Sequence, residues 1–175
     1  MNNIIEMKPE HWQKVWDVIR PVFRKGDTYI FDPKISESEA KNIWYETCDK
    51  TFICFDENNE ILGTYYLKKN QPGFGSHVCN CGYIVAESAR RKGVALRMCK
   101  HSQSIAKKLG FKAMQFNFVV STNYGAIKLW EKLGFKVIGT IPKGFEHPTN
   151  GYVDAKIMYK WLNNDRRYKN FITNY

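Results

Sequence analysis

Residues 88–98 read SARRKGVALRM, and this stretch is the first of two motifs on which the predicted fold depends. Three consecutive cations, Arg90, Arg91 and Lys92, lead into Gly93, where the small residues that follow predict the start of a helix. Cations are unfavourable there, because the helix macrodipole makes the N-terminus positive. Backbone N–H groups at a helix start, beside a glycine that allows close approach, form a ready anion site. The stretch therefore predicts a bound anion, with a solvated cationic turn as the alternative.

The composition predicts one globular domain. A chain of 175 residues with 43% hydrophobic residues can bury a sizeable core. No apolar run approaches the roughly 20 residues that span a bilayer, and the N-terminus lacks the pattern of a signal peptide. We therefore expect a cytoplasmic protein without a membrane association. The domain is expected over residues 1–162, followed by a polar tail over residues 163–175.

The net charge of +10 favours an anionic partner without identifying it. Nucleic acid, acidic lipid and a phosphorylated small molecule all fit, but the cations are spread along the chain rather than gathered in a basic arm. The chain also lacks a motif that combines stacking aromatic residues with basic ones, so we expect no nucleic-acid partner.

The five cysteines are an odd number without the spacing of a disulfide framework. Cys79 and Cys81, separated by one residue on a predicted strand, are expected to point to opposite faces of the sheet. We therefore predict buried free thiols in a reducing compartment and no metal site.

Periodicity predicts alternating strands and helices along the chain. A capping box begins the second helix at Ser36, and Gly110 and Gly134 are expected to end the two later helices. The strand and helix order of the second half predicts an α/β domain with a mixed sheet covered by helices. The strands are expected over residues 4–7, 51–56, 60–69, 78–85, 111–120, 135–142 and 152–162, and the helices over residues 9–24, 36–47, 94–109 and 123–133.

A second element, NYGAIKLWEKLGF at residues 123–135, follows the cationic turn. Together the two elements resemble the GNAT-type N-acetyltransferase superfamily. Residues 90–95 match its Q/R-x-x-G-x-G/A signature, and residues 123–135 match N-x-x-A-x-x-L-x-x-K-L-G-F. The resemblance covers residues 3–162. It implies a single-domain GNAT-like α/β fold, with a mixed, mostly antiparallel sheet, helices on both faces and a splayed central pair of parallel strands.

The resemblance also implies that acetyl-CoA is the co-substrate and explains the cationic turn. The backbone amides of residues 91–95 would hold the pyrophosphate, and the cationic side chains of the turn would meet phosphates. The main chain of Val85 would pair with the pantetheine arm, and Asn123 would hydrogen-bond the pantetheine or the thiol end. The cofactor-binding residues implied in this way are Val85, Arg90, Arg91, Lys92, Gly93, Val94, Ala95 and Asn123.

The sequence departs from the family pattern at Trp130, where many members carry the tyrosine that protonates the leaving thiolate. A tryptophan N–H does not supply a proton. A thiol of pKa about 8.5 makes the loss worth about 2 kcal/mol at neutral pH, which water or another donor can cover. Tyr124, Tyr83 and Tyr65 are the candidate acids. The general base is also open, and His147 and Asp154 are the groups considered for it.

Asn80 and Asn117 lie mid-strand among apolar neighbours, where an unpaired amide costs about 1–3 kcal/mol. We predict that they form the catalytic and substrate-binding pocket for an acceptor amine, with backbone satisfaction as the alternative. The pair, with VVSTN and GFEHPTNGYVD, resembles the subgroup that acetylates small imino acids such as azetidine-2-carboxylate. In that subgroup the loop at residues 26–29 covers the acceptor, and Tyr29 is a substrate-binding residue.

The expected activity is transfer of the acetyl group to the nitrogen of a small amine or imino acid by direct attack in a ternary complex. Acetylation of protein or peptide N-termini is the alternative within the same enzyme class. A regulatory module that binds acetyl-CoA without catalysis is an alternative outside it. A homodimer is left open.

Overall fold

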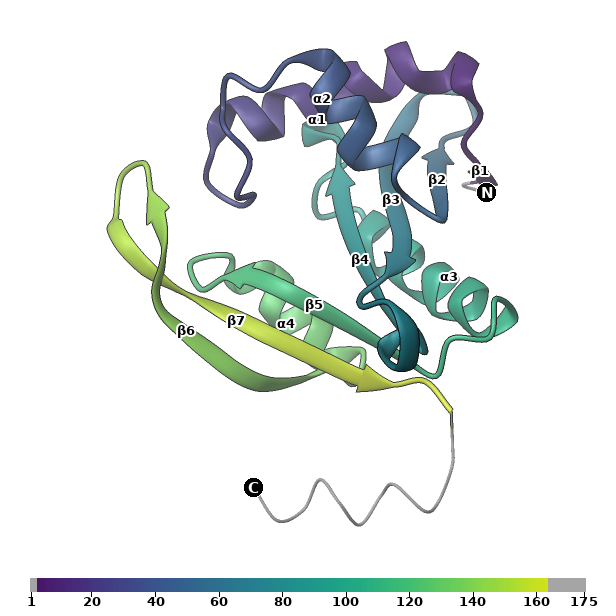
Figure 1. Ribbon diagram of the computed structural model, residues 1–175. Coiled ribbons are helices and arrows are strands. Elements are labelled where there is room, and N and C mark those ends of the chain that lie inside the picture. The colour runs from purple at the N-terminus through teal and green to yellow at the C-terminus, as the bar shows by residue number, and fades with distance from the viewer. Residues whose placement is uncertain (1–2, 164–175) are drawn as a thin grey trace.

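The computed structural model describes residues 3–163 and shows one mixed sheet of seven strands, in the order β1-β2-β3-β4-β5-β7-β6 (Figure 1). Only β4 and β5 run parallel, and every other neighbouring pair is antiparallel. This arrangement confirms the predicted fold class. The strands are β1 (Asn3–Glu6), β2 (Lys50–Phe55), β3 (Ile61–Lys69), β4 (Val78–Val85), β5 (Ala113–Val120), β6 (Lys136–His147) and β7 (Gly151–Trp161). The predicted tail from residue 164 on lies outside the described residues.

The helices begin and end close to the predicted positions. α1 (Trp12–Lys25) ends at Gly26, and α3 (Val94–Lys108) follows the left-handed Gly93. The capping box is present at Ser36, where α2 (Glu37–Lys41) begins, and α4 (Tyr124–Lys132) is capped by Asn123. The second helix differs from the expectation, because after α2 it continues as a π-helical turn, η2 (Asn42–Glu46).

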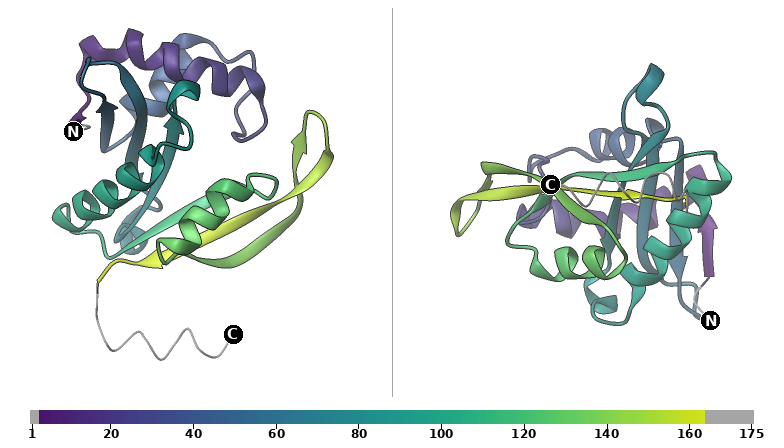
Figure 2. Two further views of the ribbon diagram at one scale, coloured as in Figure 1. Left: turned by 180° about the vertical axis from the view of Figure 1, so that it is seen from behind. Right: turned by 90° about the horizontal axis from the view of Figure 1, so that it is seen from below.

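The helices cover both faces of the sheet (Figure 2). α1 and α2 pack on one face through a cluster that includes Trp16, Ile19 and Trp44. α3 and α4 pack on the other face through a cluster that includes Met98 and Trp130. Side chains of β4 contribute to both clusters, because successive side chains of a strand point to opposite faces of the sheet.

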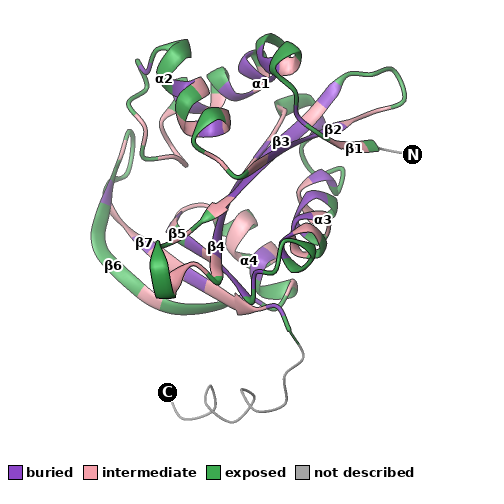
Figure 3. Ribbon diagram, turned by 45° about the vertical axis from the view of Figure 1, so that its right-hand side comes forward, coloured by how far each residue is buried: buried purple, intermediate pink, exposed green. Residues whose placement is uncertain are grey.

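Two predictions for single strands are wrong. Cys79 and Cys81 share the face that packs on α3, because residues two positions apart on a strand point the same way. All five cysteines are nevertheless free thiols. β6 also continues past Pro142, where the sequence pattern ends it, and reaches His147. The pairing with β7 shifts register between Ile141 and Phe145, which accommodates a proline that cannot donate to the ladder. Figure 3 shows how exposed this edge strand is.

The parallel contact between β4 and β5 is short, and it positions the site. The two strands pair only over Val78↔Ala113, Cys79↔Met114 and Asn80↔Gln115, and then diverge. The side-chain amide Nδ2 of Asn80 donates to the main-chain oxygen of Gln115 at 3.0 Å, at the point where the ladder stops. A register shift in β5 between Phe116 and Val119 bends the strand away. The predicted splayed pair is therefore present.

Candidate active site

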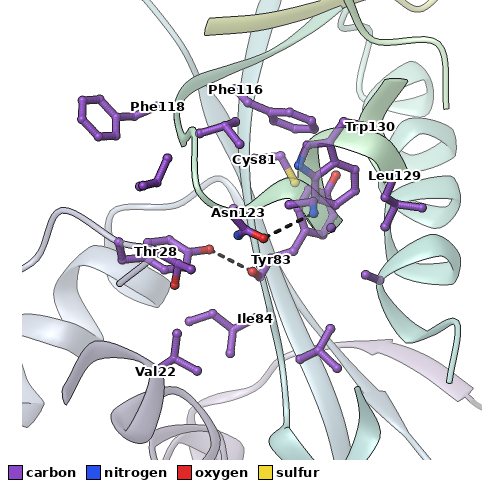
Figure 4. Close-up of a pocket in the computed structure, with 18 of the residues that line it drawn as sticks. Val22, Thr28, Cys81, Tyr83, Ile84, Phe116, Phe118, Asn123, Leu129 and Trp130 are labelled. Carbon is purple, nitrogen blue, oxygen red and sulfur yellow. Dashed lines mark hydrogen bonds between the residues drawn. The ribbon is translucent and has the colours of Figure 1, made fainter. Parts of the chain in front are cut away.

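A cavity of about 1080 Å³ fills the space between the diverging strands (Figure 4). At one end it is lined by the turn that precedes α3 and by the first residues of α3 and α4. At the other end it is lined by the loop after α1, by side chains of β3 to β5 and by the tip of the β6–β7 hairpin. Because one continuous cavity reaches both ends, two ligands can be held in contact with each other.

The edge of β4 that faces the cavity offers main-chain hydrogen-bonding groups. The oxygen of Val78 and the nitrogen of Ala86 bond toward β3, to Asn70 and Leu62. By the alternation of a strand, the main-chain groups of the odd-numbered residues face the gap, and those of Val85 are among them. Val85 lines the cavity as well. An extended ligand can therefore pair with this edge like an added strand.

The turn before α3 has the backbone of an anion site. Arg91 and Gly93 both adopt left-handed conformations, with φ of 61° and 74°. Gly93 is the N-cap of α3 and no side chain caps this end, so the first N–H groups of the helix are left for a ligand. Val94 and Ala95 line the cavity beside it. A side chain at Gly93 would meet no heavy atom within 4 Å, so the glycine serves the backbone conformation rather than close packing.

The three cations of the turn are not equivalent. Arg90 and Arg91 line the cavity, whereas Lys92, also a described residue, is not among the lining residues. The main-chain oxygen of Lys92 accepts a hydrogen bond from Nη2 of Arg97 at 3.3 Å, which braces the turn against α3. The two arginines are thus placed to meet phosphate groups, and Lys92 contributes charge from outside.

Asn123 lies opposite β4, at the start of α4. Its Oδ1 accepts a hydrogen bond from the backbone nitrogen of Ala126 at 3.3 Å and so caps the helix. Its Nδ2 has no hydrogen-bond partner among residues 3–163 and lines the cavity as a donor. Asn123 therefore fits both a structural and a ligand-binding role.

Asn80 and Asn117 both line the cavity, but their amides are engaged differently. Asn80 is 7% exposed, and besides its bond to the main chain of Gln115 its Oδ1 accepts from Tyr66 Oη at 3.2 Å. Asn117 is exposed; it accepts from Gln115 Nε2 at 2.9 Å and donates to Asn70 Oδ1 at 2.7 Å. The amide of Asn80 is thus satisfied by the backbone, which is the alternative considered for it. The exposed amide of Asn117 bonds other side-chain amides and can exchange them for a ligand. Their catalytic role stays a prediction.

Tyr29 reaches the cavity from the loop after α1. Its Oη donates to the main-chain oxygen of Tyr83 at 2.9 Å, and its ring stacks on Phe31 at 5.8 Å between centroids. Burial raises the pKa of Tyr29 well above its usual value. Tyr29 is therefore a neutral residue that joins the loop to the cavity-facing edge of β4.

The candidate acids are now distinguished by their partners. Tyr83 Oη lies 2.6 Å from Ser102 Oγ and Tyr65 Oη lies 2.6 Å from His101 Nδ1, both within the core on the α3 side. Burial raises the pKa of both phenols. Tyr124 lines the cavity and is 69% exposed. Trp130 also lines it, packed on Tyr83 and Phe116 with ring centroids 5.0 Å and 5.1 Å away. Tyr124 is the phenol that remains available for proton transfer.

Candidate bases are few around the cavity. Asp27 is the one carboxylate that lines the cavity within residues 3–163, and it lies 2.7 Å from Lys25 Nζ. His147 lines the cavity, and its Nδ1 accepts from the backbone nitrogen of Thr149 at 3.2 Å. Asp154 lies elsewhere and accepts from the backbone nitrogen of Lys143 at 3.0 Å. Lys68 was not found from the sequence, because it lies in no motif, and Asp27 was not named although it lies in the loop at residues 26–29 that was expected to cover the acceptor.

No helix in the described part of the chain is long and apolar enough to cross a membrane. Among the same residues no group of three or more His, Cys, Asp or Glu side chains is placed to hold a metal ion.

The comparisons with known proteins agree with this geometry. The model of the acetyltransferase (GNAT) family matches residues 12–135. N-acetyltransferase aca1 from Schizosaccharomyces pombe is 36% identical over an alignment of 154 residues, and the match covers 75% of this chain and 71% of aca1. The structure of a GCN5-related N-acetyltransferase from Kribbella flavida superposes with a TM-score of 0.87 at 35% identity, covering 91% of this chain and 97% of that one.

A more distant neighbour shows the fold with its ligand. A GNAT superfamily phosphinothricin acetyltransferase from Sinorhizobium meliloti, solved in complex with acetyl-CoA, has a TM-score of 0.82 at 16% identity. The superposition covers 93% of this chain and 89% of that one.

Proposed function

Because the chain belongs to the GNAT acetyltransferase family and is an acyltransferase, we propose that it transfers the acetyl group of acetyl-CoA to the nitrogen of a small amine or imino acid. The observation that supports this most is the continuous cavity between β4 and β5, which is lined by the turn before α3 at one end and by Tyr29, Asn80 and Asn117 at the other. The imino-acid subgroup is the finer form of the proposal.

The residues of the turn end would bind acetyl-CoA. The left-handed backbone at Arg91 and Gly93 directs N–H groups to the pyrophosphate, and the guanidinium groups of Arg90 and Arg91 suit phosphate oxygens. The main chain of Val85 would hold the pantetheine as an added strand, with Asn123 Nδ2 donating from the other side. This assignment leaves the thioester near the point where the strands meet.

The opposite end would bind the acceptor. Tyr29, Asn80 and Asn117 line this part of the cavity, beneath the loop after α1 and the tip of the β6–β7 hairpin. In the proposal Asn117 orients the nitrogen, since it is exposed and its present partners are the amides of Gln115 and Asn70, which a ligand can replace. Asn80 maintains the wall through its bond to Gln115.

Direct attack fits this site better than an acetylated enzyme. Cys81 is the thiol that lines the cavity, and burial raises its pKa well above the usual value, so that it stays protonated and weakly nucleophilic. The neutral acceptor nitrogen would attack the thioester carbon and form the C–N bond, the C–S bond would break, the nitrogen would release its proton to water, and the thiolate would take a proton from water or Tyr124. An amine of pKa near 10 is about 0.1% neutral at pH 7, a penalty of about 4 kcal/mol without a strong base.

A panel assay tests the proposal. Release of CoA is measured with acetyl-CoA and with amines, imino acids and peptide N-termini, each at matched concentration. We expect the highest kcat/KM for a small amine or imino acid. Preference for a peptide by a factor of about ten or more would replace the proposal with N-terminal acetylation. Binding of acetyl-CoA without turnover of any acceptor in a broad panel would point to the regulatory module.

A further inference from the structure

Lys68 is a cation in the acceptor half of the cavity with no anion of its own. It lies on β3 directly across from Asn80 of β4, so the two side chains leave the same face of the sheet as neighbours. Its Nζ lies 5.2 Å from the centroid of the Tyr66 ring, and both residues line the cavity. Within residues 3–163 no carboxylate oxygen lies within 4.0 Å of this ammonium group. Lys68 is half-buried, so water solvates its charge only in part.

The other charges around the cavity make Lys68 distinctive. Arg90 and Arg91 belong to the turn end, where the proposed pyrophosphate neutralises them. Asp27 is already paired with Lys25 at 2.7 Å. The acceptor half therefore presents one uncompensated positive charge, and it would repel an acceptor whose only charge is an ammonium group.

We infer that Lys68 binds a carboxylate of the acceptor, and that the acceptor is therefore an amino or imino acid rather than a simple amine. The inference rests on the proposed function and names the substrate class of the same site. A carboxylate held by Lys68 places the adjacent α-nitrogen beside Asn80, near the point where β4 and β5 part. The face of the Tyr66 ring stabilises the Lys68 ammonium group, whose N–H donors stay available to the ligand.

The competing explanation is that Lys68 only packs on Tyr66. A packing role predicts a change in thermal stability and an equal effect on all acceptors. A carboxylate-binding role predicts a change in discrimination between an acid and its amide, because the amide keeps the shape and the nitrogen but loses the negative charge. The two roles are therefore distinguished by the ratio of kcat/KM for the acid to kcat/KM for the amide, and not by the loss of activity alone.

The test uses three variants of the full chain. Lys68→Met removes the charge and retains most of the stem, Lys68→Arg retains the charge, and Lys69→Met is the matched control on the exposed neighbour. Acid and amide pairs, such as azetidine-2-carboxylate and azetidine-2-carboxamide, are assayed for CoA release. Calorimetry of the CoA-saturated protein with the N-acetylated acid and the N-acetylated amide gives a readout that does not depend on turnover.

We expect the wild type to prefer the acid, and Lys68→Met to lower kcat/KM for the acid about 10- to 100-fold, the range that one charge-assisted hydrogen bond supplies. The amide should change by less than about twofold, and Lys68→Arg should retain most of the preference. An equal loss for acid and amide, or no loss, would overturn the inference. Turnover of simple amines or peptides in preference to acids would overturn it while leaving N-acetylation intact. Calorimetry without binding of any acetylated acid, together with no turnover in the panel, would overturn both proposals.

Discussion

Replacing Gly93 by aspartate and by asparagine separates the charge of the anion site from its shape. Both residues tolerate the left-handed φ of 74° better than other side chains, and the added Cβ meets no heavy atom within 4 Å. Any side chain is strained at this φ, but aspartate and asparagine are among the residues that adopt it most readily, so the fold should be preserved at a small and similar cost in stability. The two variants are nearly isosteric and differ by one negative charge, placed beside the proposed pyrophosphate.

The size of the effect follows from Coulomb's law. A carboxylate about 5 Å from a phosphate charge is disfavoured by about 3 kcal/mol at an effective dielectric constant of about 20. Screening at physiological salt reduces this to about 1.5–3 kcal/mol, or about 10- to 100-fold in the dissociation constant. Gly93→Asn should weaken acetyl-CoA binding by less than about tenfold, because its side chain competes for the helix N–H groups without repelling the ligand.

Calorimetric titration with acetyl-CoA measures both variants, and thermal melts without ligand confirm that they are folded. The difference between the two variants should shrink as salt is raised, because the repulsion acts at the protein surface. Equal dissociation constants for Gly93→Asp and Gly93→Asn, in proteins with unchanged melting temperatures, would show that the pyrophosphate does not bind at this turn.

Three other predictions concern the acid, the acceptor pocket and pH. Trp130→Phe should change kcat less than about tenfold in steady-state assays, because the indole supplies no proton, and a loss above about a thousandfold in a folded variant would contradict this. Asn117→Ala should cost about 2–4 kcal/mol in kcat/KM at unchanged acetyl-CoA affinity, whereas Asn123→Ala should weaken the cofactor as well; equal, modest defects in both would reduce Asn117 to support of its strand. Burial, with a smaller contribution from Lys108, lowers the pKa of His101, so stability is present above its unfolded pKa of about 6.5 and is lost as pH falls below it. Chemical denaturation at several pH values should show this loss, and His101→Gln should reduce it.

The sequence predicted an element well where residues at its own ends, such as a glycine, determine where it begins or stops. The apolar run of β4 was predicted at its observed bounds, and the glycine that follows α3 fixed its end to within a residue or two. The predicted strand at residues 135–142 was too short, because a proline has no N–H to donate and so predicts the end of a strand. In the structure β6 pairs with β7 again beyond Pro142, at Phe145 to His147. The π-helical turn after α2 leaves no trace in the spacing of apolar residues.

The residues of the site also fall into those that a local motif indicates and those that only the folded chain brings to the cavity. The turn before α3 and the cap of α4 are short contiguous motifs, so their positions beside the cavity could be expected from the sequence. Lys68 and Asp27 reach the cavity only through strand register and loop closure, which depend on contacts between distant segments. The hydrogen bond between Tyr29 and the oxygen of Tyr83 also joins residues 54 positions apart, and no local pattern indicates it.

The short pairing of β4 with β5 has a consequence for the folding of the protein as a whole. Beyond Asn80, β4 is an internal sheet edge whose main-chain groups toward the gap pair with no other strand among residues 3–163, although the oxygen of Tyr83 accepts a hydrogen bond from Tyr29 Oη. The cavity beside this edge is lined by the first residues of α3 and α4 and by the tip of the β6–β7 hairpin, and its volume of about 1080 Å³ leaves room for a ligand. A ligand that binds only the native state at 100 times its dissociation constant adds about 2.7 kcal/mol to stability. The supply of acetyl-CoA would then set how much of this protein survives unfolding and proteolysis, as well as how fast it works.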